Sequence, residues 1–460
     1  MKNNHLVGLT FLLVVLLNLN HLVLADSWQQ IQTTTTPEAS QYHSLDYING
    51  QIYLFGGEYV STSVNSLNSL VAFRGNSLND LWEYDEGNNT WEENSTLGPS
   101  PSSRKYHATA TSNGKLYVFG GQEATDIASD VWEYTPETNT WVQLEVGGDT
   151  SPLHNRLFHR ATAGEDDKIY ISGGMDVSTG NVTLSDVWGY DVANHSWTQV
   201  ASCSSSLGRY GHVATIQGQN LIMGMGRRDK TVQGDMVNVN LDTGSCTTIP
   251  VQGPAPEPAK FSAFTSTGDW IILSGGTNQT ITKSGQKELS TYTNSSTTWL
   301  FNTQTNQWTQ GSDGPAQNAG AAAYLGYNQF LFFGGNTDSG YSNETWVYTA
   351  DIDTSASCAS IDAQLNINIL CASIGSSQYQ VNLTHVTHPE SAGGHLWKLG
   401  TAASASSNNN NCANLDSQYN ISIPCVNVSG TIYQVELSRY NHPNDPSGFY
   451  WTLGTATIVP

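Results

Sequence analysis

The sequence predicts an all-β fold, a six-bladed β-propeller followed by a small β-domain made of two tandem repeats. Three observations support this prediction. A unit of roughly fifty residues recurs six times between Trp28 and about residue 350. Each copy has the pattern of four short antiparallel strands, which is typical of a propeller blade. A second, unrelated sequence is then duplicated. The expected divisions are a leader (1–25), the propeller (26–352), and C-terminal repeats 1 (353–404) and 2 (405–460).

The recurring unit is clearest between Arg104 and Trp141. Alternating residues 107–110 lead to a turn at Asn113-Gly114, and the apolar run 116–119 ends in Gly120-Gly121. A loop follows, then the aromatic segment 131–134, a polar turn and Trp141. Alternation, aromatic and β-branched residues and Asn-Gly turns favour strands over helices.

Two landmarks identify the other copies. The double glycine recurs at Gly56-Gly57, Gly120-Gly121, Gly173-Gly174, Gly275-Gly276 and Gly334-Gly335, with a degenerate form at Gly224-Met225-Gly226. The fourth expected strand carries Trp91, Trp141, Trp197 and Trp308, with Cys246 at that place in the fourth copy. The glycines are expected to be structural, since residues without a Cβ allow close packing.

These residues resemble kelch repeats. The resemblance rests on the Gly-Gly pairs, the spaced Tyr and Trp, and the Arg-x-x-His openings at Arg104/His107, Arg156/His159 and Arg209/His212. It covers residues 28 to about 350 and implies a propeller. It implies little about activity, because function resides in sites built on a fold.

The sixth copy lacks a fourth strand after Trp346. The segment Ser27–Ile31 matches Thr140–Leu144 of the second copy. We therefore expect residues 27–31 to supply the missing outer strand and close the ring, which would leave no open edge between blades.

Residues 1–25 predict a secretory signal peptide with cleavage after Ala25, and hence a secreted or periplasmic protein. The alternative is a membrane anchor, but polar residues interrupt the apolar run and Trp28 is needed in the propeller. No later stretch is apolar enough to span a bilayer after cleavage. The net charge of −22 excludes nucleic acid as a partner, because phosphate binding needs a basic face.

The six cysteines are expected to pair in an oxidising compartment. Cys358 and Cys371 have the same spacing as Cys412 and Cys425, which predicts one local disulfide in each C-terminal repeat. Cys203 lies just after the fourth strand of the third copy and Cys246 on the fourth strand of the fourth copy, and because these strands belong to neighbouring blades a third bridge is plausible. The two repeats align without a gap from Cys358 onto Cys412, and each has the pattern of three short strands.

One face of the propeller is the candidate binding surface. Long insertions between strands two and three, at 58–79 and 277–297, emerge beside the start of strand one. The candidate ligand-binding residues on this face are basic: Arg104, Arg156, Arg209, Arg227, Arg228 and Lys260. Guanidinium groups suit carboxylates. The alternative for the three repeated arginines is that they brace blades. The repeated histidines are expected to be structural, and no metal or cofactor is predicted.

The leading interpretation is a non-catalytic binding protein for a glycan, a surface polymer or a protein. One alternative is a sugar mutarotase resembling the exported sialic-acid mutarotase, which needs a Glu/Arg acid–base pair; Glu58 and Glu123 follow glycine pairs. A second alternative is a copper-radical oxidase resembling galactose oxidase. That chemistry needs a Cys–Tyr crosslink and His ligands, whereas all six cysteines have disulfide partners in the predicted scheme.

Overall fold

The computed structural model describes two compact units, which we treat separately. The first, the propeller, comprises 26–325 and 329–349, and the structure describes it apart from 61–75, 146–151, 165, 179 and 285–286. Residues 326, 328 and 350–352 are also described and group with the second unit. The second, the C-terminal unit, is described over 359–458 apart from 362–366, 375–376, 388–394, 405–412, 416–419, 429–430 and 441–449. The expected signal peptide lies outside the described residues. Among the described residues, no helix has the length and apolar character needed to cross a membrane.

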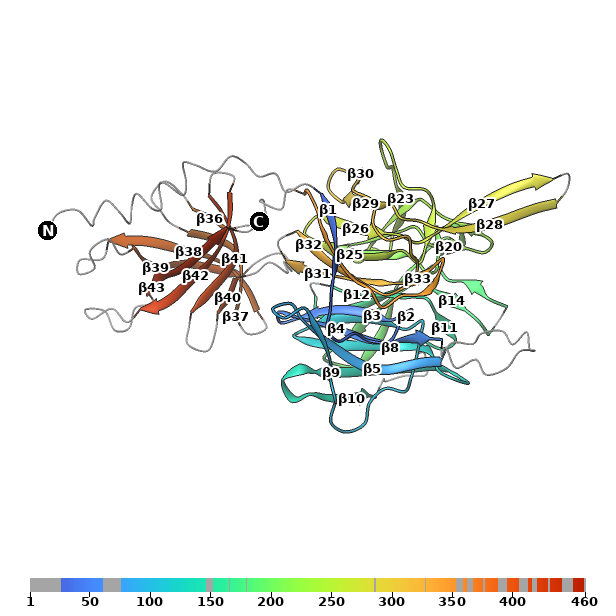
Figure 1. Ribbon diagram of the computed structural model, residues 1–460, viewed down its shortest axis with the longest axis horizontal. Helices are drawn as coiled ribbons and strands as arrows, with labels where there is room; N and C mark the ends of the chain where they lie inside the picture. The colour runs from blue at the N-terminus through green and yellow to red at the C-terminus, as the bar shows by residue number, and fades with distance from the viewer. Residues whose placement is uncertain are drawn as a thin grey trace. The chain divides into compact units, whose positions relative to one another are not determined.

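The first unit is built from four-stranded antiparallel sheets, which correspond to the six sequence repeats and are called blades one to six (Figure 1). Blade one contains β3 (Ser44–Ile48), β4 (Gln51–Tyr59), β5 (Asn76–Asp85) and β6 (Thr90–Glu93); blade two contains β7 (Ala108–Ser112), β8 (Lys115–Gln122), β9 (Ile127–Thr135) and β10 (Thr140–Leu144). Blade three contains β12 (Arg160–Ala163), β13 (Lys168–Ser172), β16 (Asp186–Asp191) and β17 (Ser196–Ser202); blade four contains β18 (Val213–Gln217), β19 (Asn220–Gly224), β22 (Met236–Asn240) and β23 (Cys246–Ile249). Blade five contains β25 (Ala263–Thr267), β26 (Trp270–Ser274), β29 (Thr298–Asn302) and β30 (Gln307–Gln310); blade six contains β31 (Ala321–Gly326), β32 (Gln329–Phe333), β35 (Thr345–Thr349) and β1 (Ser27–Ile31).

The N-terminal strand closes the ring, as the sequence predicted. Strand β1 pairs with β35 and places Trp28 opposite Tyr348, just as Trp141 lies opposite Tyr134 in blade two. The Trp28 ring lies 4.8 Å from that of Phe332, and its indole N–H donates to the Ser312 carbonyl at 3.0 Å. The first and last segments of the propeller therefore share one sheet.

Apolar cores lie between neighbouring blades. Leu116 and Val118 pack toward blade one, whereas Tyr117 and Phe119 pack toward blade three. Both faces of the second strand are thus buried, which explains why the sequence shows a continuous apolar run rather than alternation.

The glycine pairs have the structural role that was expected. Gly120 and Gly121 both have positive φ, +54° and +105°, a region that favours glycine. A Cβ on Gly121 would lie 2.8 Å from the Cβ of His107, so the glycine allows strand two to approach the start of strand one.

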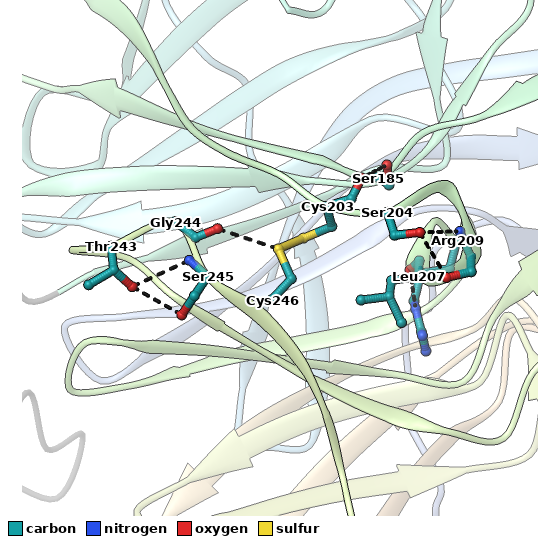
Figure 2. The surroundings of a disulfide bond; sticks show 10 residues. Ser185, Cys203, Ser204, Leu207, Arg209, Thr243, Gly244, Ser245 and Cys246 are labelled. Atoms are coloured by element: carbon teal, nitrogen blue, oxygen red, sulfur yellow. Dashed lines mark hydrogen bonds between the residues drawn. A yellow bond between two sulfur atoms is a disulfide. The ribbon is translucent and has the colours of Figure 1, made fainter.

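One disulfide joins the outer strands of blades three and four (Figure 2). Cys203 follows β17, Cys246 begins β23, and their Cα atoms are 5.7 Å apart. This confirms the third predicted bridge. Cys358 and Cys412 lie outside the described residues, so the other two bridges stay predictions.

The C-terminal unit is one sheet formed by both repeats. Repeat 1 contributes β36 (Ala359–Ile361), β37 (Ile367–Ile374), β38 (Ser377–Thr387) and β39 (His395–Ser404); repeat 2 contributes β40 (Ala413–Leu415), β41 (Ile421–Val428), β42 (Thr431–Tyr440) and β43 (Tyr450–Ile458). Strands β39 and β43 pair, with Trp397 opposite Trp451. The short strands β36 and β40 pair in parallel with β41 and β37 of the other repeat.

This pairing corrects the expectation of three strands for each repeat. The additional strands are three residues long, too short to show a pattern in the sequence, and each is completed by a partner from the other repeat. The divisions 353–404 and 405–460 therefore describe sequence repeats that interlock in one unit.

Candidate functional site

The segments between the second and third strands of the blades lie on the same face of the propeller as the segments that lead into the first strands. The sequence analysis predicted this arrangement. The short strands β2 (Ser40–Gln41), β11 (Arg156–Leu157) and β24 (Ala259–Lys260) each pair with the chain just beyond a glycine pair. Isolated bridges at Lys105–Gln122, Tyr210–Arg227 and Asn318–Asn336 repeat this arrangement in the other blades. We call this the hairpin face; β27 (Thr277–Ser284) and β28 (Lys287–Asn294) extend from it (Figure 1).

A ring of main-chain hydrogen bonds surrounds the propeller axis at the hairpin face. One residue from each blade, two positions before the first strand, adopts positive φ: Tyr42, Tyr106, Phe158, Gly211, Phe261 and Ala319. Along this ring, the N–H of one residue donates to the carbonyl of its counterpart in the preceding blade, at 2.7–3.3 Å for the five bonds recorded. The ring fixes the relative positions of the blades without using side chains.

Aromatic side chains of these residues fill the axis. The ring of Tyr42 lies 4.6 Å from Tyr106 and 5.4 Å from Phe261, and Phe158 lies 5.2 Å from Phe261. Gly211 makes room for this packing, since a Cβ there would lie 2.3 Å from the Phe261 ring. Burial raises the pKa of Tyr42. Sequence reasoning missed this cluster, although an aromatic residue stands at this position in four repeats.

The three repeated arginines lie beneath the hairpin face. The exposed fractions of Arg104, Arg156 and Arg209 are 0%, 4% and 0%. Each guanidinium binds an aspartate at the start of the third strand of its own blade, at 2.7 Å for Arg104–Asp130, 2.7 Å for Arg156–Asp186 and 3.1 Å for Arg209–Asp235. Each also donates to the main chain at the glycine pair, as Arg104 does to the Gly120 carbonyl at 2.9 Å.

This geometry favours the bracing alternative over ligand binding. The guanidinium joins strands within its blade, while the main-chain carbonyls of Arg104 and Arg209 accept from Gly57 and Gly174 of the preceding blades. Although burial opposes it, the hydrogen bond from Arg156 holds the pKa of Asp186 below its usual range. The aspartate partners were missed; their signal is an Asp directly before the repeated motif of the third strand, as Asp130 stands before residues 131–134. In blade four, Arg209 also contacts the turn after Cys203, through Leu207 (Figure 2).

Lys260 differs from these arginines. It stands one position later in the repeat, where blade two has Lys105, and its amine lies 5.0 Å and 5.1 Å from the rings of Phe261 and Tyr292. Arg227 lies 5.9 Å from the same Tyr292 ring. Neither cation has a carboxylate within 4 Å among the described residues. Burial, and secondarily Arg227, lowers the pKa of Lys260 to about 8.

A polar pocket of about 280 Å³ opens beside Lys260. Its lining consists mainly of amides, hydroxyls and aromatic rings: Tyr42, Lys260, Phe261, Thr277, Tyr292, Asn294, Asn318, Asn336 and Asp338. Asn318 donates to Asn294 at 2.6 Å, and Asn294 donates to Asp338 at 3.0 Å, so these hydrogen bonds fix the amide orientations. We call this the mouth pocket. A larger hollow of about 630 Å³ at Thr35, Trp82 and Glu92 of blade one has no cation in its lining.

Glu58 and Arg228, two other charged residues on this face, have hydrogen-bond partners within the protein. Glu58 is 4% exposed and accepts from Lys105, from Gln41 at 2.6 Å and from Tyr341 at 2.9 Å. Arg228, predicted as a ligand residue, is partly exposed and donates to the Ser206 carbonyl. The mouth pocket therefore combines Lys260 with polar side chains, and Arg227 lies beside it against the Tyr292 ring.

Comparisons with known proteins agree with the fold. Residues 68–226 match the KLHDC2/KLHL20/DRC7 kelch-repeats domain, and residues 148–362 match the Attractin/LZTR1 β-propeller. Mouse Kelch domain-containing protein 1 is 30% identical over 170 residues, covering 36% of this chain and 39% of the relative. Rab9 effector protein with kelch motifs from Xenopus laevis is 28% identical over 187 residues, covering 39% and 50%. The chain thus spans half or less of the length of these relatives.

Sheet topology and these matches together define the class: the chain is a kelch-repeat β-propeller protein. The C-terminal unit lies almost entirely beyond the matched residues.

Proposed function

We propose that the protein is a secreted or periplasmic, non-catalytic binding protein that holds an acidic group of a glycan, surface polymer or protein in the mouth pocket. The observation that supports this most is the pair of cations, Lys260 and Arg227, which share the Tyr292 ring without a carboxylate partner among the described residues. An anionic ligand would satisfy both. A charge-assisted hydrogen bond in a partly desolvated site is stronger than one between neutral groups.

The electrostatic setting supports selectivity. The chain carries a net charge of −22. The pocket lining balances one cation, Lys260, against one carboxylate, Asp338, which is held by Asn294, and Arg227 adds a second cation beside Tyr292. Polyanions would be repelled by the whole molecule, whereas a single acidic group could be accepted at the pocket. The amides of Asn294 and Asn318 donate to Asp338 and to the Asn336 carbonyl, and Asn318 donates to Asn294, so they form a fixed polar wall beside the rest of the ligand.

Packing near the axis supports binding rather than the two catalytic alternatives. Tyr42, Tyr106, Phe158 and Phe261 fill the axis at the hairpin face. The glutamates that a mutarotase would need are engaged, Glu58 as described above and Glu123 with Arg104 at 3.5 Å. Cys203 and Cys246 are bonded to each other, which removes both from any Cys–Tyr crosslink.

The test is a screen of residues 26–460 on arrays of acidic and neutral glycans and peptides, followed by titration calorimetry with the ligand obtained. Lys260→Ala and Arg227→Ala should each weaken binding roughly ten- to hundredfold, as for loss of one charged hydrogen bond. Arg228→Ala is the matched control, because Arg228 lies on the same loop but contacts Ser206. Unchanged affinity in both pocket variants, or a screen that returns neutral ligands alone, would contradict the proposal.

Export is a separate part of the proposal. Amino-terminal sequencing of protein recovered outside the cytoplasm should begin at Asp26. An intact Met1 in exported protein would contradict cleavage after Ala25.

A further inference from the structure

Arg160 is the only charged residue among the first residues of the six innermost strands. The strands β3, β7, β12 and β18 are neighbours around the axis, and each is the first strand of its blade. Arg160 begins β12 directly after His159. The equivalent residues in the other blades are small or uncharged: Ser44, Ala108, Val213, Ala263 and Ala321. A guanidinium group therefore begins the innermost strand of blade three, at a position where the other five blades have an uncharged residue.

The side chain of Arg160 reaches across two neighbouring blades. Its Nε donates to the His212 carbonyl of blade four at 2.6 Å. Its guanidinium carbon lies 4.7 Å from the ring centroid of Phe264 in blade five. The head group thus lies along the inner wall. The chain runs from Phe158 at the hairpin face into β12, and Arg160 comes two residues later. Arg160 is therefore farther from the hairpin face than Phe158.

The charge of Arg160 is not balanced within the described part of the chain. The buried arginines 104, 156 and 209 each bind an aspartate, but Arg160 has no carboxylate within 4 Å. Its Nη1 and Nη2 have no hydrogen-bond acceptor among the described residues. Neither nitrogen is fully buried, so a molecule the size of water can reach both.

The surroundings make this charge costly. Burial lowers the pKa of Arg160 to about 10, which still leaves it protonated at neutral pH. The facing His212 and the adjacent His159 are buried, and burial together with nearby arginines lowers the pKa of both. Both histidines are therefore uncharged at neutral pH and add no further positive charge beside Arg160. A desolvated cation without a partner is unfavourable and favours uptake of an anion.

We propose that the inner wall of the propeller holds a second binding site, in which Nη1 and Nη2 of Arg160 bind a small monovalent anion, either a halide or a free carboxylate. Thr162, two residues along β12, lies on the same side of the strand as Arg160. The site is distinct from the mouth pocket, whose lining contains neither Arg160 nor Thr162.

Chloride-35 NMR line broadening of residues 26–460 tests this site in solution, since exchange of chloride with a bound state broadens its resonance. Wild-type protein should show excess linewidth that falls by at least half in Arg160→Met and is retained in Lys260→Ala. Acetate should displace the same fraction of the broadening. Equal broadening in wild type and Arg160→Met would overturn the proposal, and failure of acetate to compete would overturn its carboxylate part.

Crystals grown in sodium bromide provide a measurement that does not depend on a variant folding. An anomalous peak should lie within hydrogen-bond distance of Nη1 or Nη2 of Arg160 in the wild-type protein. Arg160→Lys should keep a peak nearby because it retains the charge. A wild-type map with bromide elsewhere and none at Arg160 would overturn the proposal.

Discussion

Blades two to four and blades five, six and one differ at the position four residues before the first strand. In blades two to four this position holds an arginine that is buried against an aspartate. In blades five, six and one it holds Ala259, Gln317 and Ser40. Asp80, the blade-one counterpart of the aspartates, keeps one buried oxygen without a partner. The mouth pocket lies on this second side of the face.

The comparison suggests that the same segment of the repeat has two roles, bracing in blades two to four and pocket formation in blade five. Where the arginine brace is present, the hairpin face is tied to the strands below it. Where the brace is absent, the next residue in the repeat, Lys260, faces a polar pocket instead. The following predictions test these two roles, beginning with the largest expected effect.

Removing a brace should destabilise the propeller strongly. Arg104→Ala, Arg156→Ala and Arg209→Ala should each lower the free energy of unfolding by about 3–5 kcal/mol, because an aspartate is left half-buried and unpaired. Denaturant unfolding measures the loss, and Gln317→Ala of blade six is the unbraced control, with a small effect. Affinity of the folded fraction for a mouth ligand should stay intact; normal stability with weakened binding would instead restore the ligand role.

Breaking the disulfide should weaken the same side of the molecule. The Cys203–Cys246 bridge closes a loop with a sequence separation of 43 residues, for which chain entropy suggests a stabilisation of about 4 kcal/mol. The double variant Cys203→Ser/Cys246→Ser should lose much of this in thermal unfolding. Non-reducing peptide mapping of the wild type should also recover Cys358–Cys371 and Cys412–Cys425. A different pairing would show that the repeat spacing misled the prediction.

Truncating the closing strand tests the other side of the ring. Trp28→Ala should cost about 2 kcal/mol, less than a fully buried tryptophan, because Trp28 is only partly buried against Phe332 and Tyr348. Gln29→Ala, exposed on the same strand, is the control. Equal melting temperatures for the two variants would argue that β1 does not stabilise the ring.

Acidification should destabilise blades one to four, which carry the buried histidines His43, His107, His159 and His212. Burial lowers the pKa of His43 to about 4 and of His107 and His159 to about 3. Each depressed pKa contributes stability that is complete above pH 6.5 and is lost as pH falls toward the folded value. Between pH 7 and 6 the loss should be about 0.7 kcal/mol for each histidine.

Blades five and six have Ser262 and Gly320 at the histidine position, so they contribute nothing to this dependence. Asp46, whose pKa burial raises to about 6, opposes the trend because its protonated form is favoured in the fold. His107→Gln should flatten the pH profile of the melting temperature, and Asp46→Asn should steepen it. A profile unchanged by His107→Gln would contradict the assignment.

Local sequence patterns determined the class of fold. Glycine pairs, tryptophan spacing and apolar runs each depend on the conformation or burial of a few neighbouring residues. The strands and their repetition could therefore be recognised in the sequence. The match of Ser27–Ile31 to Thr140–Leu144 even predicted closure, because one strand was missing from one repeat. The Cys203–Cys246 bridge followed from placing both residues on neighbouring outer strands.

Only the tertiary structure decided what the charged residues do. The six candidate cations look alike in sequence, yet Arg104, Arg156 and Arg209 are buried while Lys260 stands at a pocket. The difference depends on which carboxylate lies within reach, and Asp130, Asp186 and Asp235 are 26 to 30 residues away along the chain. Likewise, Arg160 is unbalanced only because strands from three blades meet around it. Charge pairing is set by distance in space, which a repeat pattern does not encode.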